Sequence, residues 1–93
     1  MYAVIFKAEI NELSDEYLSM AENLRSLAIK KYGCVEFTSV TEGKHEIAIS
    51  YWDNLEQIKI WKQDPKHLAA QDLGRTQFYN SYKVQIVEIL REY

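Results

Sequence analysis

The chain has little of the residue types that build several classes of functional site. Its 93 residues include one cysteine, one proline and three glycines. A single cysteine, Cys34, excludes an intrachain disulfide, which suits a reducing cytosol, and no clustered Cys/His spacing indicates zinc. The three glycines are isolated, which excludes a phosphate-binding loop and a Rossmann-type nicotinamide or flavin site. We therefore expect no metal and no cofactor.

Positive charge is also scarce. The chain has eleven Lys and Arg and fourteen Asp and Glu, which gives a net charge of −3 and a pI near 5.3. This excludes a basic field for nucleic acid. The apolar run at the start of the chain has no basic leader or cleavage site and is too short for a membrane span. No nucleophile-and-base signature is present. We expect a cytoplasmic protein that binds neither nucleic acid nor membranes.

Apolar periodicity predicts four strands and two helical regions in one domain, residues 1–93. We expect strands over 2–9, 35–42, 45–52 and 82–90, with a tight turn joining the second and third. In the third strand, Ala48, Ser50 and Trp52 share one face. Tyr17 belongs to an apolar stripe at helical spacing in the first helix.

Capping residues predict where the helices begin and end. Ser14 is the expected N-cap of the first helix, and Gly33 lies just past its end. Asp53 is the expected N-cap of the second helical region. That region restarts at Asp64–Pro65, with proline at the first helical position, and ends at Gly74.

The predicted order β-α-β-β-α-β is the ferredoxin-like arrangement of the α+β class, with both helices on one face of an antiparallel sheet. The other face carries apolar residues from the first, third and last strands. A soluble protein rarely exposes so large an apolar patch, and so short a chain has a marginal core. We therefore expect a homodimer that packs this face against its copy.

The segment from Trp61 to Tyr82 concentrates aromatic and polar groups suited to a small-molecule pocket. We expect the ring of Trp61 either to form a pocket wall or to pack in the core. We expect Tyr79 and Tyr82 to lie either at the rim of this pocket or at a dimer interface. We expect His45 to be exposed to solvent and Trp52 to have a structural role.

Three polar residues of the same segment are candidate anchors for a ligand. His67 lies in the first turn of a helix, which favours a neutral imidazole that can hydrogen-bond a hydroxyl, although a capping role is the alternative. Gln71 follows one turn later on the same face. Arg75 could hold a phenolate, a carboxylate or a peroxide anion, or bridge to Glu or to the last helical carbonyls.

The order Trp61, His67-x-x-Ala-Gln71-x-x-Gly-Arg75, an aromatic residue and a Val/Ile-rich last strand resembles the antibiotic biosynthesis monooxygenase family. The resemblance spans nearly the whole chain. It implies a dimeric α+β barrel and, for the enzymes of the family, cofactor-independent oxidation of phenols in a cavity that stabilises the substrate anion. By this resemblance His67 and Arg75 are catalytic. Trp61, Gln71, Tyr79 and Tyr82 would bind a small aromatic substrate.

Two other functions stay open. One is a non-catalytic dimeric module that holds a small ligand in the same cleft. The other is haem binding, since some relatives bind and degrade haem. Those relatives place the iron ligand about ten residues after the tryptophan, where this chain has Gln71, and use an asparagine on the first strand, where residues 2–9 have none. Both departures argue against haem.

Overall fold

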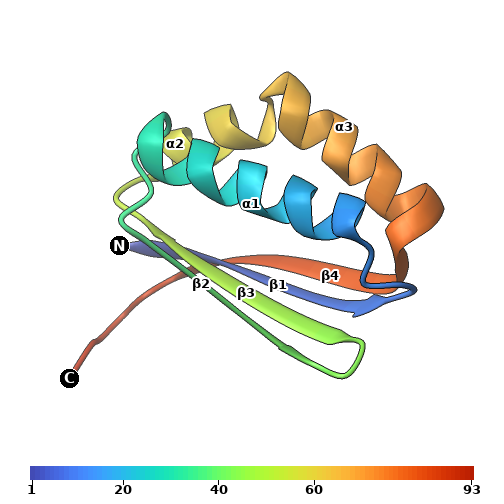
Figure 1. Ribbon diagram of the computed structural model, residues 1–93. Helices are drawn as coiled ribbons and strands as arrows, with labels where there is room; N and C mark the ends of the chain where they lie inside the picture. Colours follow the sequence, from blue (N-terminus) through green and yellow to red (C-terminus); the bar gives the residue numbers. More distant parts are fainter.

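The computed structural model describes residues 1–93 and contains an antiparallel sheet with helices packed on one face only (Figure 1). The elements are β1 (Tyr2–Ile10), α1 (Asp15–Lys30), β2 (Glu36–Glu42), β3 (His45–Trp52), α2 (Leu55–Lys62), α3 (Pro65–Leu73), a π-helical turn η1 (Gly74–Phe78) and β4 (Tyr79–Glu88). The sheet order is β2-β3-β1-β4. This confirms the predicted ferredoxin-like α+β fold. None of the helices is both long and apolar enough to cross a membrane.

Side-chain caps position the helices that cover the sheet. Ser14 Oγ accepts the Tyr17 N–H at 3.1 Å, and Asp64 Oδ1 accepts the Lys66 N–H at 2.8 Å, as the sequence predicts. The prediction of Asp53 as the cap of α2 is wrong. The helix begins one residue later, and the side chain of Asn54 accepts the Gln57 N–H at 2.9 Å instead. An asparagine oxygen caps as well as an aspartate, so the two neighbours compete on equal terms.

A β-bulge places two tyrosines on the helix-covered face of the last strand. Strand β4 begins at Tyr79, three residues before the predicted start, because it already pairs with Ile10 of β1. Tyr82 pairs with Ala8, so three residues of β4 span two of β1. Without the extra residue, Tyr79 and Tyr82 would point to opposite faces.

The core consists of two separate clusters between the helices and the sheet. One surrounds Trp52, which is fully buried and donates its indole N–H to Ser50 Oγ at 2.8 Å. The other contains Ile10, Tyr17 and Phe78, with Tyr17 meeting the Phe78 ring edge-on at 5.4 Å. Because the clusters are distinct, the layer between the helices and the sheet is not packed continuously.

The opposite face of the sheet carries no helix (Figure 1). Strand pairing places Ile5 of β1, Ile49 of β3 and Val87 of β4 on this face, with Ile47 and Val40 toward its edge. Ile47 is 39% exposed and Val40 is 61% exposed, and only 16 of the 93 residues are buried in the single chain. The predicted apolar face is therefore present.

Candidate functional site

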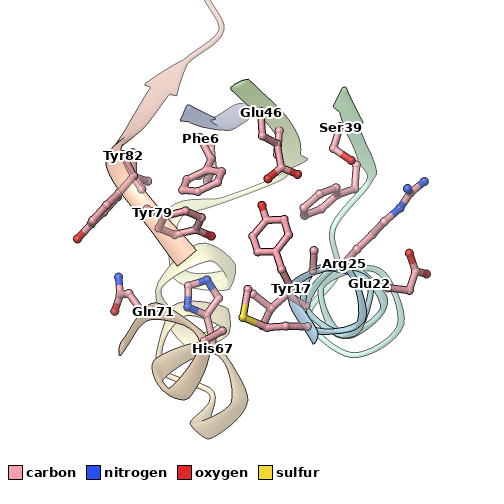
Figure 2. Close-up of a pocket in the computed structure, with 18 of the residues that line it drawn as sticks. Phe6, Tyr17, Glu22, Arg25, Ser39, Glu46, His67, Gln71, Tyr79 and Tyr82 are labelled. Carbon is pink, nitrogen blue, oxygen red and sulfur yellow. The ribbon is translucent and has the colours of Figure 1, made fainter. Parts of the chain in front are cut away.

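A cavity of about 270 Å³ lies between the sheet and the helices, lined by 22 residues of which 14 are hydrophobic. All four strands and all three α-helices contribute to it. Its volume is just below the roughly 300–1,000 Å³ typical of ligand pockets, which favours a ligand of one or two rings. Figure 2 shows Gln71 and Tyr82 at one end and Ser39, Arg25 and Glu22 at the other.

Trp61 of α2 forms part of the cavity wall and part of the core. Its ring lies 5.1 Å from the Trp52 ring and meets His67 edge-on at 4.5 Å. It is 6% exposed, and its indole Nε1 has no hydrogen-bond partner. Both interpretations of the sequence thus apply to this residue, since it packs in the core and also faces the cavity.

His67 enters the cavity from the first turn of α3, where the Asp64 cap and Pro65 fix the start of the helix. Burial lowers the pKa of His67, and the positive charge of Lys62 lowers it further. The direction agrees with the predicted neutral ring, but burial is its main cause. Nδ1 of His67 is buried without a partner. A neutral imidazole offers one donor and one acceptor, so the ring can hydrogen-bond a ligand.

Tyr79 lies against the cavity because η1 contains glycine at its first position. Its ring is 5.3 Å from Phe6, 6.0 Å from Tyr17 and 5.7 Å from Tyr82. A Cβ on Gly74 would stand 2.4 Å from Tyr79 Cε2, although the φ of −58° suits any residue. Burial raises the pKa of Tyr79, and the nearby carboxyl of Glu46 adds to the effect. The phenol therefore stays protonated.

The structure leaves Arg75 outside the cavity lining. Its Nε donates to the Tyr82 hydroxyl at 2.9 Å, in an exposed position. Gln71, Tyr79 and Tyr82 do line the cavity, together with Trp61 and His67. Five of the six residues singled out in the sequence thus meet around one space, and Arg75 reaches it only through Tyr82. Their chemical roles stay predictions.

Sequence reasoning missed Glu46 and the cavity-facing role of Tyr17. Glu46 pairs with Ala8 on the helix-covered face of β3 and is 8% exposed. Burial raises its pKa, and its Oε2 has no partner. The alternation that puts Ala48 and Trp52 on the covered face also includes Glu46, so the signal was available. Tyr17 was assigned only to an apolar helical stripe, but it lines the cavity and is 2% exposed.

The polar groups around the cavity are suited to binding a hydroxylated ring. They include a buried carboxyl, an imidazole, an indole N–H, an amide and phenols, and 14 of the 22 lining residues are hydrophobic. No three His, Cys, Asp or Glu side chains gather in a group that could hold a metal ion. Such a site can orient a flat ligand by stacking and exchange a proton with it.

Comparisons with known proteins agree with this fold. No protein-family model matches the chain. The chain is 36% identical over 92 residues to the uncharacterized protein YqjZ of Bacillus subtilis (strain 168), covering 98% of this chain and 81% of YqjZ. The crystal structure of an antibiotic biosynthesis monooxygenase superposes with a TM-score of 0.82 at 15% identity, covering 98% of this chain and 100% of the other.

A second solved structure is similar to the same extent. SnoaB, a cofactor-independent oxygenase from Streptomyces nogalater, superposes with a TM-score of 0.81 at 13% identity, covering 98% of this chain and 94% of SnoaB. At such identities the two structures show a shared fold, whereas the similarity to YqjZ shows kinship. The chain therefore belongs to the same family as YqjZ and has the fold of the antibiotic biosynthesis monooxygenases, as the sequence resemblance predicted.

Proposed function

We propose that the chain is a cofactor-independent monooxygenase or quinol-oxidising enzyme that acts on small aromatic compounds. One observation carries the proposal. Glu46 Oε2, Trp61 Nε1 and His67 Nδ1 are buried without hydrogen-bond partners, and all three residues line the same cavity. Buried polar atoms are ordinarily paired. A hydroxylated aromatic ring would supply partners for them and fill the apolar remainder.

The reaction needs no redox group in the protein because the substrate supplies the electrons. In quinol oxidation the substrate loses two electrons and two protons, and dioxygen takes them up as hydrogen peroxide. In monooxygenation one oxygen atom replaces a ring hydrogen, and the other leaves as water with that hydrogen and the hydroxyl proton, so the phenol becomes a quinone. We assign stacking to Trp61, hydrogen bonds to the substrate oxygen to His67 and Gln71, and closure of the rim to Tyr79 and Tyr82.

Arg75 supports this site from outside the cavity lining. Its hydrogen bond orients the Tyr82 hydroxyl at the rim. A fixed hydroxyl at the rim is a preorganised donor for a bound substrate. Arg75 is therefore part of the proposed catalytic site and acts through Tyr82.

The proposal includes a homodimer through the sheet face without helices. The apolar residues of this face support it, since contiguous apolar patches on soluble proteins mark interaction sites. A second copy offers the same apolar surface under two-fold symmetry. A stable interface of this kind buries roughly 1,200 Å² or more in total.

Oxygen uptake with simple quinols under air tests the function. We expect consumption of dioxygen and quinone absorbance above the autoxidation rate. His67→Ala should slow turnover about 10- to 100-fold, because one hydrogen bond to a charged species is worth about 1.5–3 kcal/mol. His45→Ala removes the same side chain from an exposed position and is the matched control. Tight binding of quinols without turnover would refute the enzyme hypothesis and support a non-catalytic ligand-binding module.

A further inference from the structure

We propose that Glu46 makes the cavity selective for neutral aromatic molecules that carry a phenolic hydroxyl, and that its carboxylate takes the proton of that hydroxyl. This inference rests on the proposed function and names its substrate class and proton acceptor. It starts from a carboxyl group placed where the fold would ordinarily have an apolar residue. The neighbours of Glu46 on the covered face are Ala8 on β1, Ala48 on β3 and Thr41 on β2.

The position of Glu46 directs its carboxylate into the cavity. Figure 2 shows the side chain extending from β3 toward the helices, with the hydroxyl of Tyr17 pointing at it and Tyr79 beside them. The residue is 8% exposed, and Oε2 has no hydrogen-bond partner. A buried ionised group without a partner is costly, so the fold does not gain stability from this carboxylate. A ligand hydroxyl is the partner that this geometry lacks.

The surroundings of Glu46 make an anionic ligand a poor fit. The side chains beside it are the phenols of Tyr17 and Tyr79, and neither carries a positive charge. Two cations also line the cavity away from Glu46. Lys62 is half-buried and its charge acts on His67, whereas Arg25 is exposed at the far end and lies over the Phe37 ring, 6.0 Å from its centroid. A ligand carboxylate beside Glu46 would place two negative charges next to each other in a mainly apolar lining, and like charges at such a distance repel.

The proton transfer balances within the proposed reaction. The Glu46 carboxylate forms a bond to the hydroxyl proton, and the electron pair of the broken O–H bond stays on the substrate as a phenolate. Dioxygen takes two electrons from the substrate, one after the other. The reduced oxygen then receives the proton from Glu46 and the proton of the second hydroxyl, so hydrogen peroxide and quinone leave and Glu46 is again ionised.

The neighbouring groups favour this role. Burial raises the pKa of Glu46, which makes its carboxylate a stronger base than an exposed one. Burial and the charge of Glu46 raise the pKa of Tyr79, so this phenol remains a hydrogen-bond donor that can stabilise the substrate anion. The base and the donor therefore line the same part of the cavity.

Ligand selectivity tests the inference independently of turnover. We would titrate wild-type protein, Glu46→Gln and Glu12→Gln with 2-naphthol and 2-naphthoate and follow tryptophan fluorescence. The wild type should bind the naphthol at least about tenfold more tightly, a difference of 1.4 kcal/mol. Glu46→Gln should gain about tenfold in affinity for the naphthoate, with little change for the naphthol. Glu12→Gln removes an exposed charge in the loop before α1 and should behave as the wild type.

Turnover with quinols tests the proton step. Glu46→Gln should lower kcat by about 100-fold or more and change KM little, because the lost group acts on the proton and not on binding. Glu46→Asp keeps the charge and should recover the selectivity and part of kcat, which excludes a purely structural effect of Glu46→Gln. It also provides the test if Glu46→Gln does not fold.

The outcomes separate the inference from the proposed function. Equal binding of naphthol and naphthoate by the wild type, or unchanged selectivity in Glu46→Gln, would overturn the ligand class. An unchanged kcat in Glu46→Gln would overturn the proton acceptor. Selective binding that Glu46→Gln abolishes, without any oxygen uptake, would support the ligand class and refute both the oxidation and the proton step.

Discussion

Gly74 permits the ring of Tyr79 to line the cavity, and replacing it with alanine should disturb that ring. The backbone at Gly74 has φ −58° and ψ −49°, which any residue adopts. A glycine here is therefore explained by space and not by conformation. The added methyl group would stand 2.4 Å from Tyr79 Cε2 and 2.8 Å from Cδ2. The ring must move by about 1 Å to restore ordinary contact near 3.5 Å.

Two opposing effects determine the stability of Gly74→Ala. Alanine stabilises a helical position by about 1 kcal/mol relative to glycine. An extra methyl group in a packed site costs about 1–3 kcal/mol. The Tyr79 ring has little room to yield, because Phe6, Tyr17 and Tyr82 surround it. We therefore expect a net loss of up to about 2 kcal/mol in the free energy of unfolding, with overpacking the larger effect.

A double-mutant cycle in urea denaturation checks the cause. In a Tyr79→Ala background the clash is absent, so Gly74→Ala should become stabilising by about 1 kcal/mol. All four proteins must be compared at one concentration, since the proposed dimer would contribute to stability. Gly74→Ala should also weaken naphthol binding, because the displaced ring changes the shape of the cavity. A stabilising Gly74→Ala in the wild-type background, or the same effect in both backgrounds, would refute the reasoning.

Three further predictions concern the dimer, the buried carboxyl and haem. Ile49→Asp should give a monomer in sedimentation because a charge would be buried on the apolar sheet face, whereas Ile29→Asp on the exposed side of α1 should stay dimeric. Burial raises the pKa of Glu46, so Glu46→Gln should stabilise the protein against urea at pH 7. The gain in stability should vanish as the pH falls below the pKa of glutamate in the unfolded chain, about 4.3. A difference in stability that does not depend on pH would contradict this. Hemin should bind only weakly and nonspecifically, because an amide at Gln71 is a poor iron ligand; a sharp Soret band at one hemin per subunit that His67→Ala abolishes would contradict this.

Local signals predicted most of the fold. Ser14 and the pair Asp64–Pro65 mark helix starts through side-chain and ring geometry, which depend on near neighbours only. The start of β4 could not be predicted in this way. Tyr79 joins the sheet because Ile10 of β1 is available to pair with it across a bulge, and a pairing between such distant segments has no local signature.

Less of the candidate site could be predicted from the local sequence pattern. The helical spacing of His67 and Gln71 predicted a shared face correctly, because both lie within α3. Arg75 follows Gln71 by four residues, but the intervening chain enters the wider π-helical turn η1, so α-helical spacing no longer describes its direction. Glu46 was missed for another reason. A carboxylate in a strand ordinarily faces water, and only the covered position of β3 in the assembled sheet overrides that expectation.

The distribution of unpaired polar atoms supports a ligand site more strongly than any single residue does. Other polar groups away from the cavity have partners within the chain: the buried Trp52 indole donates to Ser50, and the Tyr32 hydroxyl donates to the buried Asp64. Four buried side-chain atoms have no partner, and three of them belong to cavity-lining residues, the exception being Gln57 Oε1. Each such atom lowers stability, so a sequence shaped by stability alone would have paired or replaced them. Their concentration around one apolar space is the pattern expected where a bound molecule completes the hydrogen bonding.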